Sequence, residues 1–598
     1  MKNLVFISTL FFFVFGLNAQ DKRLKGIEKE LNKVLEYTNS PGFAVAVVEG
    51  NNVVYAKGFG YRDYENKVPV DANTLFAIGS TSKAFTSAIL GILRDKDELS
   101  FDDNPRKFIP ELEFYNDDMN DHLIIKDLMR HSSGLPRHDG SWYFFPSHDK
   151  DSLIQRLKYH EPFTGIRQQW YYNNFGFLIQ GVIAEKITGK TWEETINDYF
   201  FEPLNMNRSN TSIAEMKSSS NAAFGYQLKE NDVISKMDYY DIAGMSPAGS
   251  INSSVNDMSK WLITWINDGK YNEQDIIPEN YINEAMSSQM IVGGNIPDDE
   301  FPDIHFANYG YGWMLQSYKG HYRVEHGGNI DGFSANVAFF PSDKVGIVVL
   351  ANQNGSAVPS LVRNIMADRM IGAEKTDWAE RYKERLDKGK KEQEEAKKES
   401  SSSKVKNTKP SHINLDYTGS YNNDGYGTFD IYVENDSLFS KINNDKMYLH
   451  HFHYDVFELV DVVENKVDTT QYGNAIKVNF STNDAGDISD AKIKIEPTLE
   501  ALTFKRTPKT IDVDSKTLEL YPGDYELAGT TIKVYIKEDI LYLFVPGQPE
   551  YELMATDTHK FSFKTLEGFK VEFIEADNGD IIELKAIQPN GTFIAKKK

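Results

Sequence analysis

Hydrophobic and polar residues follow strand-like patterns at both ends of the first part of the chain and helix-like patterns between them. Residues 42–63 and 334–352 each read as two apolar strands around a polar turn. Residues 80–96, 176–188 and 255–267 have apolar positions at helical spacing. This order predicts one sheet built from the N- and C-terminal segments, with a helical region inserted.

The pattern changes after Gly372, and the change predicts a linker. The chain has 598 residues, which is too long for a single core. Residues 377–399 are densely charged, which favours a solvated helix, and residues 400–411 are polar and serine-rich. We therefore expect a globular domain over residues 20–375, followed by a charged helix and linker over residues 376–410.

Beyond residue 411 the sequence has the character of β structure. Polar and apolar residues alternate around acidic turns, as they do in half-buried strands. The stretch LDYTGSY at 415–421 recurs as LELYPGDY at 518–525. The repeat predicts two related antiparallel modules, over residues 411–508 and 511–598, each a small β-barrel or sandwich.

The first 19 residues differ from the rest of the chain. Lys2 precedes an apolar run over residues 4–17 that is too short to span a bilayer comfortably, and Ala19 offers a cleavage position. We interpret residues 1–19 as a secretory signal peptide, with a buried N-terminal helix as the alternative. The mature chain would begin near Gln20 and be exported, as a periplasmic or secreted protein. No later segment is long and apolar enough to be an integral membrane segment.

Charge and composition narrow the set of partners. The formal charge is −23, which disfavours nucleic acid or anionic membranes, because phosphate binding needs a positive surface. The chain has no cysteine, which excludes disulfides and thiolate metal sites. His450, His451 and His453 offer two metal ligands on one strand face, but no further ligand pattern completes a site. We favour an aromatic strand there and predict no metal and no cofactor.

Ser80 and Lys83 stand at the start of a predicted helix, in the stretch FAIGSTSKAFT. The helix N-terminus favours developing negative charge, and a lysine three residues after a serine lies on the same face. Such a lysine can accept the serine proton if burial lowers its pKa. The alternative is a helix-capping serine beside a solvated lysine. Four other Ser-x-x-Lys pairs in the chain make that alternative the default for the motif alone.

Two further motifs lie downstream. Tyr172 and Asn174 form Tyr-x-Asn just before an apolar helix, and His326, Gly327 and Gly328 lead into the last pair of strands. Glycines let a strand edge approach a substrate closely. Each motif is weak alone, because Tyr-x-Asn recurs elsewhere in the chain and a lone histidine is more often an ordinary loop residue.

The three motifs together resemble the serine β-lactamase and penicillin-binding-protein superfamily, in its class C, D-peptidase and esterase branch. Flanks such as IKDLMRHSSGLP (125–136) and HGGNIDGFSANVAFFP (326–341) strengthen the resemblance, which covers residues 24–370. It implies an α/β sandwich: an antiparallel sheet with helices on both faces, plus an inserted helical region. The active site would lie between these two parts. A degenerate, inactive homologue is the alternative.

The resemblance implies catalytic roles for four residues. Ser80 would be the acyl-enzyme nucleophile. Lys83 and Tyr172 would be its acid/base pair, with Tyr172 as a phenolate held by nearby cationic groups. His326 would lie on the strand that lines the site.

Substrate binding is carried over in the same way. Asn174 would hydrogen-bond the substrate, and Gly327 and Gly328 would allow its close approach. The backbone N–H groups of Ser80 and Asn329 would form the oxyanion hole.

Two departures from the family pattern bear on the substrate. His326-Gly327 replaces the Lys-Thr of many β-lactamases, and a histidine is only partly charged near neutral pH, so we expect inefficient β-lactam hydrolysis. Asn173 replaces a small residue and would narrow or re-polarise the site. The resemblance implies an exported serine hydrolase of small amide substrates, above all short peptides with D-residues. The alternatives are a carboxylesterase on short acyl esters, a weak β-lactamase and a non-catalytic envelope-binding protein.

The C-terminal part also has a family likeness. Residues 415–442 and 449–459 resemble the β-barrel domain appended to some D-amino-acid-specific serine peptidases. That likeness implies a homo-oligomer assembled through the β modules, and restricted access to the active site. We also expect the loops at 137–149 and 290–306 to shape the pocket.

Overall fold

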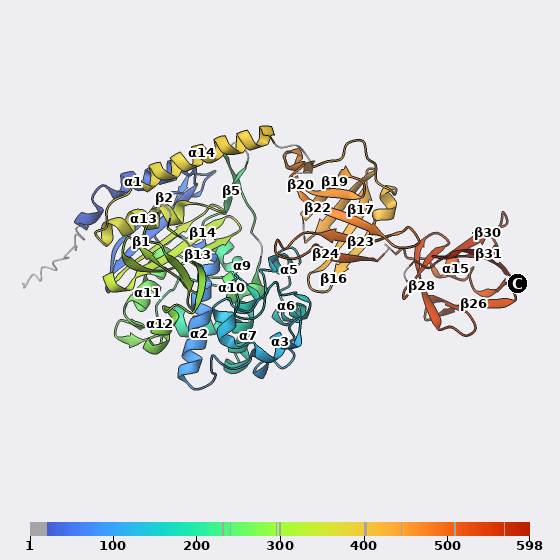
Figure 1. Cartoon of the computed structure of the whole chain (residues 1–598), viewed down its shortest axis with the longest axis horizontal. Helices are drawn as coiled ribbons and strands as arrows, with labels where there is room; N and C mark the ends of the chain where they lie inside the picture. The colour runs from blue at the N-terminus through green and yellow to red at the C-terminus, as the bar shows by residue number, and fades with distance from the viewer. Residues whose placement is uncertain are drawn as a thin grey trace, which may run out of the picture.

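The computed structural model shows three bodies in a row along the long axis of the molecule (Figure 1). An α/β body is followed by two β-barrels, and the second barrel lies at the far end. The described residues are 21–229, 232–239, 241–294, 296–297, 301–399, 403–443, 445–463, 465–507, 510–566 and 568–598. The predicted signal peptide lies outside them.

A nine-stranded antiparallel sheet forms the centre of the α/β body. Its strands, in spatial order, are β10 (Met290–Gly294), β11 (Phe306–Tyr309), β12 (Met314–Tyr318), β13 (His321–Ile330), β14 (Phe333–Phe340), β15 (Val345–Ala351), β1 (Gly42–Glu49), β2 (Asn52–Asp63) and β3 (Val68–Pro69). Phe43 on β1 pairs with Ala351 on β15, so the first and last strands of the body in chain order are neighbours inside the sheet. The predicted sheet is confirmed.

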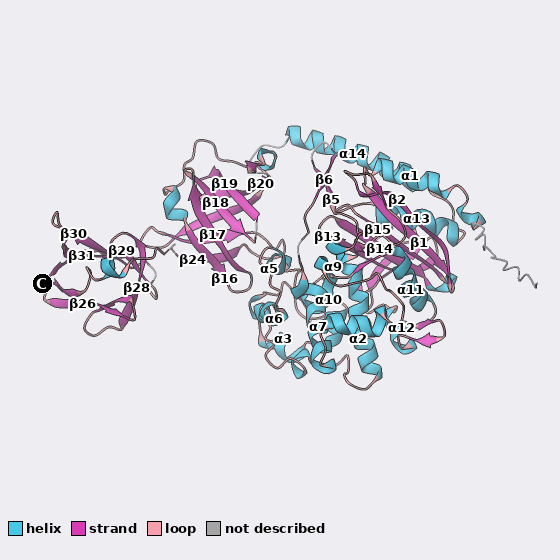
Figure 2. Cartoon of the chain, turned by 180° about the vertical axis from the view of Figure 1, so that it is seen from behind, coloured by secondary structure: helices cyan, strands magenta, loops and turns pink. Residues whose placement is uncertain are grey.

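Helices cover both faces of this sheet (Figure 2), and strand β1 shows why. Its side chains alternate between the two faces, as in any strand. The odd-numbered residues 43–47 pack with α1 (Ile27–Tyr37) and α13 (Val358–Met370). The even-numbered residues 44–48 join the core that contains α2 (Lys83–Asp95) and α11 (Val255–Ile266). Because both faces are buried, residues 43–48 are all apolar.

The inserted region contains the predicted helices. Those expected at 80–96, 176–188 and 255–267 are α2, α7 (Phe175–Thr188) and α11. The smaller helices of the body are α3 (Asp117–His122), α4 (Ile125–Met129), α5 (Asp139–Tyr143), α6 (Lys150–Gln155), α8 (Trp192–Ile196), α9 (Ile213–Ser218), α10 (Ser246–Gly249) and α12 (Glu279–Ala285).

The charged stretch forms α14 (Trp378–Glu399). We expected the whole helix to be solvated, but its first turn packs on the α/β body. Trp378 is buried, and its indole N–H donates to Asp368 Oδ2 at 2.9 Å. Among the residues that the structure describes, no helix combines the length and the apolar character needed to cross a bilayer.

Both C-terminal modules are closed eight-stranded antiparallel barrels. The first contains β16 (Gly419–Asn423), β17 (Gly427–Glu434), β18 (Ser437–Ile442), β19 (Asp445–His453), β20 (Val456–Val463), β22 (Ile476–Thr482), β23 (Ile488–Ile493) and β24 (Leu502–Thr507), with the short β21 (Lys466–Val467) beside β20. The second contains β25 (Gly523–Leu527), β26 (Thr530–Lys537), β27 (Ile540–Phe544), β28 (Glu550–Asp557), β29 (Lys560–Phe563), β30 (Lys570–Glu575), β31 (Ile581–Gln588) and β32 (Gly591–Lys597). Of the two predicted forms, barrel or sandwich, the structure has the barrel.

The sequence repeat corresponds to a repeated structural corner. In the first barrel, the hydroxyl of Tyr421 donates to the carbonyl of Tyr417 at 2.8 Å. In the second barrel, the hydroxyl of Tyr525 donates to the carbonyl of Tyr521 at 2.7 Å. All four rings belong to their barrel cores. The shared corner supports the prediction that the two modules are related.

The first barrel is fastened to the α/β body through the loop that contains α5. The Ser141 hydroxyl donates to the carbonyl of Gly425 at 2.7 Å, and the backbone N–H of His138 donates to Glu496 Oε2 at 2.9 Å. Phe145, from the same loop, is part of the hydrophobic core of the barrel. The barrel is thus anchored on a loop that, as described next, also lines a pocket.

Candidate active site

Ser80 lies in a 3₁₀ turn, Gly79–Ser82, that leads directly into α2. The hydroxyls of Thr81 and Ser82 donate to backbone carbonyls one turn back, at 3.0 and 2.8 Å. The Ser80 hydroxyl instead accepts a hydrogen bond from Lys83 Nζ at 3.1 Å, and Ser80 lines a pocket. The capping alternative therefore does not describe this serine.

Lys83 is fully buried behind Ser80. Its side-chain nitrogen, Nζ, also donates to the carbonyl of Ala248, at 2.7 Å. Burial holds the pKa of Lys83 well below its usual value of 10.5; the Asp139 carboxylate opposes this shift and Arg137 adds to it. An uncharged lysine at this position can accept the Ser80 proton.

Tyr172 stands beside this pair, just before α7. Lys83 Nζ and the Arg137 guanidinium lie over its ring, each 4.9 Å from the ring centroid. Burial raises the pKa of Tyr172 above its usual value, while the Ser80 hydroxyl and Arg137 act in the opposite direction. The phenol is therefore protonated at rest, rather than the phenolate that the resemblance implied. In that form it can donate a proton.

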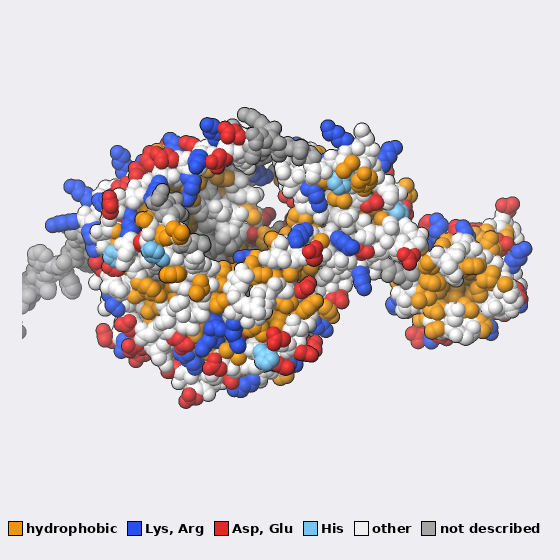
Figure 3. Space-filling view, in the orientation of Figure 1, with side chains coloured by type: hydrophobic (Ala, Val, Ile, Leu, Met, Phe, Trp, Pro, Cys, Tyr) orange, Lys and Arg blue, Asp and Glu red, His pale blue; other side chains and the backbone are white. Residues whose placement is uncertain are grey.

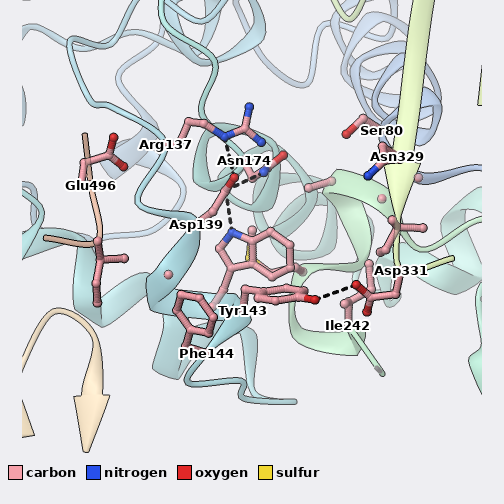
Figure 4. Close-up of a pocket in the computed structure, with 18 of the residues that line it drawn as sticks. Ser80, Arg137, Asp139, Tyr143, Phe144, Asn174, Ile242, Asn329, Asp331 and Glu496 are labelled. Carbon is pink, nitrogen blue, oxygen red and sulfur yellow. Dashed lines mark hydrogen bonds and ion pairs between the residues drawn. The ribbon is translucent and has the colours of Figure 1, made fainter. Parts of the chain in front are cut away.

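Strand β13 meets the Ser80 turn backbone to backbone. A Cβ on Gly79 would lie 3.0 Å from the backbone nitrogen of Asn329, and a Cβ on Gly328 would lie 2.0 Å from the carbonyl oxygen of Ile78. The same Cβ on Gly328 would be 3.3 Å from the backbone nitrogen of Ser80. The backbone of β13 at Gly328 and Asn329 therefore packs directly against the Ser80 turn, and Figure 4 shows Ser80 next to Asn329.

His326 lies on β13, but its ring does not line the pocket. The ring is buried, with Nε2 2.9 Å from the Tyr309 hydroxyl and Nδ1 2.6 Å from the carbonyl of Gly327. These partners fit a neutral imidazole that accepts from Tyr309 and donates to Gly327. Burial and the nearby Lys83 lower the pKa of His326 to about 4. The expected partial charge at neutral pH is therefore wrong.

Asn173 and Asn174 point in different directions. The Asn174 amide donates to Asp139 Oδ1 at 2.8 Å, and Asn174 lines the pocket as predicted. Asn173 is buried; its amide donates to the carbonyl of Pro136 at 2.7 Å, and its oxygen accepts from the N–H of Gly176 at 2.8 Å. Its side chain holds the chain entering α7 and does not narrow the site, which corrects the expectation from sequence.

The pocket next to Ser80 has a volume of about 490 Å³. The loop at 137–149 provides much of its wall, as predicted, whereas none of the described residues of 290–306 lines it. Asp139 is the centre of this wall, because it accepts from Arg137 Nε at 2.6 Å and from the Trp142 indole at 2.9 Å. Figure 4 shows Arg137, Asp139 and Asn174 side by side, with dashed lines to Asp139.

Several pocket residues had no signal in the sequence. Asp331, which accepts from the Tyr143 hydroxyl at 2.7 Å, follows directly after β13. The first barrel contributes Ile495, Glu496 and Pro497 from the connection between β23 and β24. The pocket thus has carboxylates from Asp139, Asp331 and Glu496 and one guanidinium, from Arg137. Only the loop sequence RHDGSWYFFPSHD, rich in charged and aromatic residues, gave a hint of this wall.

A serine paired with a buried lysine, set between an antiparallel sheet and a helical region, defines an active-site-serine protein of the α/β-sandwich class. The chain belongs to the Beta-lactamase family, whose model matches residues 27–367. Residues 403–506, which include all but the last residue of the first barrel, match a domain of unknown function, DUF3471.

Similar proteins agree with this family. The unguisins hydrolase ungD of Aspergillus violaceofuscus is 26% identical over 381 residues, covering 59% of this chain and 66% of that protein. Protein flp of Staphylococcus aureus strain N315 is 25% identical over 352 residues, covering 56% of this chain and 66% of that protein. The chain thus spans just under two thirds of the length of these relatives.

A solved structure shares the fold. The octameric penicillin-binding protein homologue from Pyrococcus abyssi has a TM-score of 0.53 and 21% identity. The match covers 81% of this chain and 100% of that chain.

Proposed function

We propose that the protein is a serine hydrolase that acts through an acyl-enzyme on Ser80. The observation that carries this proposal is the contact between Ser80 Oγ and the fully buried Lys83, at 3.1 Å. Lys83 takes the hydroxyl proton as Ser80 Oγ attacks the substrate carbonyl carbon. The resulting oxyanion is held by the backbone N–H groups of Ser80 and Asn329.

Tyr172 completes the first half of the reaction. It donates its proton to the leaving nitrogen or oxygen as the bond to the carbonyl carbon breaks, and it regains a proton from Lys83. Water then attacks the carbonyl carbon of the acyl-enzyme. The proton transfers among Ser80, Lys83 and Tyr172 take place in the opposite direction, and the Ser80 hydroxyl is restored.

We propose small amides, above all short peptides with D-residues, as the substrates. The pocket volume suits a small molecule. The pocket has three carboxylates against the single guanidinium of Arg137, and this charge balance disfavours a substrate carboxylate. It argues against efficient β-lactam hydrolysis. The preference for D-residues rests on the likeness of His-Gly-Gly to D-peptidases. A carboxylesterase on short acyl esters is the second candidate, because Ser80 chemistry would be the same.

A covalent probe tests the nucleophile. We expect a fluorophosphonate to add its mass to the intact protein, and Ser80→Ala to abolish the adduct. No adduct on the wild-type protein would instead favour a non-catalytic binding protein.

A substrate panel then separates the candidates. It contains D-alanyl and L-alanyl p-nitroanilides, p-nitrophenyl acetate and butyrate, and nitrocefin, each with the Ser80→Ala control. Faster turnover of the D-alanyl anilide than of the L-alanyl anilide is the expected result. Turnover of the esters alone would replace the peptidase proposal with the esterase.

Tyr172→Phe tests the proton donor. We expect kcat to fall by about 100- to 10,000-fold, the usual contribution of a positioned acid or base, with an unchanged thermal unfolding midpoint. The ring and its contacts remain in this variant, so near-normal turnover would mean that another group donates the proton.

Export and assembly are further proposals. Cleavage after Ala19 would appear as a mature N-terminus at Gln20 in protein recovered from outside the cytoplasm. Apolar side chains gather on the visible face of the second barrel (Figure 3), whose exposed residues include Ile582, Phe593 and Ile594. Such patches mark interaction sites. Light scattering would show a homo-oligomer that depends on this barrel if the proposal holds.

A further inference from the structure

A second cavity lies at the mouth of the first barrel, where the barrel meets the α/β body. Its volume is about 280 Å³, near the lower end of small-molecule pockets. Aliphatic side chains from five strands line it: Ile442, Met447, Leu459, Ile476 and Ile493. An eight-stranded barrel is just wide enough to hold one small ligand.

This cavity shares a wall with the pocket at Ser80. Tyr143, Phe144 and Ile495 line both cavities. Figure 4 shows Tyr143 and Phe144 on the side of the Ser80 pocket that is turned away from the serine. A molecule in the barrel mouth would therefore contact the residues that shape the candidate active site.

The charge at the mouth selects the head group of such a molecule. Asp445 and Asp461 line the cavity and are exposed to solvent, and among the described residues no lysine or arginine lines it. An anionic head would be repelled there, whereas an uncharged head would be tolerated. The interior offers apolar surface only, which suits an unbranched aliphatic chain.

The second barrel provides an internal comparison, because its residues correspond to those of the first. The β19–β20 and β28–β29 hairpins both have a two-residue turn and a register shift two residues before it. Counting from these turns, Met447 corresponds to Tyr551, and Leu459 corresponds to Phe563. The Tyr551 and Phe563 rings pack edge to face, 5.3 Å apart. The second barrel thus fills with two aromatic rings the space that smaller aliphatic residues line in the first.

We propose that the mouth of the first barrel is a binding site for a single aliphatic chain with an uncharged head group. This aliphatic chain is either the acyl part of a substrate that extends from Ser80 or a separate molecule that contacts the shared wall. The site goes beyond the proposed hydrolase activity, and its binding can be measured without that activity.

Fluorescence of N-phenylnaphthylamine, an uncharged apolar probe, tests the site in full-length Ser80→Ala protein. We expect binding with strong enhancement of fluorescence, displacement by decanol, and poor displacement by decanoate. The double variant Met447→Tyr/Leu459→Phe takes its residues from the second barrel and should weaken binding at least ten-fold. The reverse double variant, Tyr551→Met/Phe563→Leu, is the matched control and should bind as the parent does.

Unchanged probe binding in the double variant, with a normal thermal unfolding midpoint, would overturn the proposal. If that variant does not fold, Ile476→Glu replaces it, because Ile476 is 43% exposed and a charge there is tolerated. Unchanged probe binding in Ile476→Glu would also overturn the proposal.

Activity distinguishes the two sources of the chain. If the chain belongs to the substrate, p-nitrophenyl decanoate should have a lower KM than the acetate, and the double variant should lose that advantage. If it is a separate molecule, decanol should change the turnover of p-nitrophenyl acetate in the parent and not in the double variant. Either result supports the proposed binding site. If the protein hydrolyses none of these esters, the fluorescence measurement in Ser80→Ala protein still tests the site by itself.

Discussion

At the scale of single residues, the site depends on two groups held away from water. Lys83 is fully buried with a lowered pKa, and His326 is buried with a pKa lowered to about 4. The sequence placed both residues in motifs, and their order identified the family. It did not show protonation, because burial depends on residues such as Ala248 and Tyr309 that lie elsewhere in the chain.

The buried lysine should cost stability in a way that depends on pH. Its folded pKa lies below the unfolded value of 10.5, so the unfolded chain binds the extra proton and stability rises as pH rises towards 10.5. Lys83→Met removes this penalty. We therefore compare the thermal unfolding midpoint of Lys83→Met with that of wild type. The difference in favour of the variant should be larger at pH 7 than at pH 10, by about 2–4 °C for each kcal/mol of penalty removed.

Thermal unfolding of both proteins across this pH range measures the effect. Ser80→Ala keeps the lysine and serves as the control, which should follow the wild-type pH dependence. A difference between Lys83→Met and wild type that does not vary with pH would show that Lys83 is charged in the folded protein.

The two glycines after His326 offer a matched pair of substitutions. A Cβ on Gly328 would lie 2.0 Å from the carbonyl oxygen of Ile78, whereas a Cβ on Gly327 would meet nothing closer than 3.8 Å. Gly328→Ala must push β13 away from the Ser80 turn, at a cost of about 1–3 kcal/mol or more. We expect it to lose most activity, and Gly327→Ala to fold and turn over nearly as wild type does. Equal behaviour of the two variants in unfolding and activity assays would contradict this packing.

At the scale of elements, the loop at 137–149 joins the candidate site to the first barrel. Its Arg137 and Asp139 line the Ser80 pocket, and its Phe145 sits in the barrel core. The sequence indicated that this loop shapes the pocket, because its charged and aromatic residues stand out. It gave no sign that the loop is also the anchor of a barrel far downstream. Ser141 and Gly425 are 284 residues apart in the sequence, and His138 and Glu496 are 358 apart.

Removing the anchor should affect the site at a distance. Phe145→Ala deletes the ring of a residue that is only 8% exposed. It should lower the free energy of unfolding of the first barrel by about 3–5 kcal/mol. Because Arg137 and Asp139 belong to the same loop, we also expect a higher KM. Tyr159→Ala, whose ring is 44% exposed, is the control and should change neither quantity much. A normal KM in Phe145→Ala would show that the loop keeps its shape without the barrel.

At the scale of the whole molecule, the parts predicted from sequence are those with local signals. The alternating strands and the Tyr repeat predicted two related β modules, and helical spacing predicted the major helices. The contribution of Glu496 to the pocket was beyond reach, because that residue meets His138 across 358 positions of chain. Asn173 was misjudged for the same reason: its partner, the carbonyl of Pro136, is distant in sequence.

The two barrels should differ in their importance for activity. The first barrel supplies part of the pocket wall, whereas no residue of the second lines that pocket among those described. A chain ending at Thr507 should keep kcat/KM within a few-fold of the full-length value. A chain ending at Glu399 should lose most of it, even if the α/β body still folds by circular dichroism. Comparable activity of the two truncated chains would show that the first barrel is dispensable.

The anchoring of Phe145 in the first barrel also sets an order of events during synthesis. A ribosome makes the whole α/β body before it makes β24, the strand that closes this barrel at Thr507. Until then the loop at 137–149 has no barrel to hold it, and contacts between such distant segments form late. The nascent chain would thus contain Ser80 and Lys83 well before it has a finished pocket. We expect hydrolytic activity only after the first barrel has closed around Phe145.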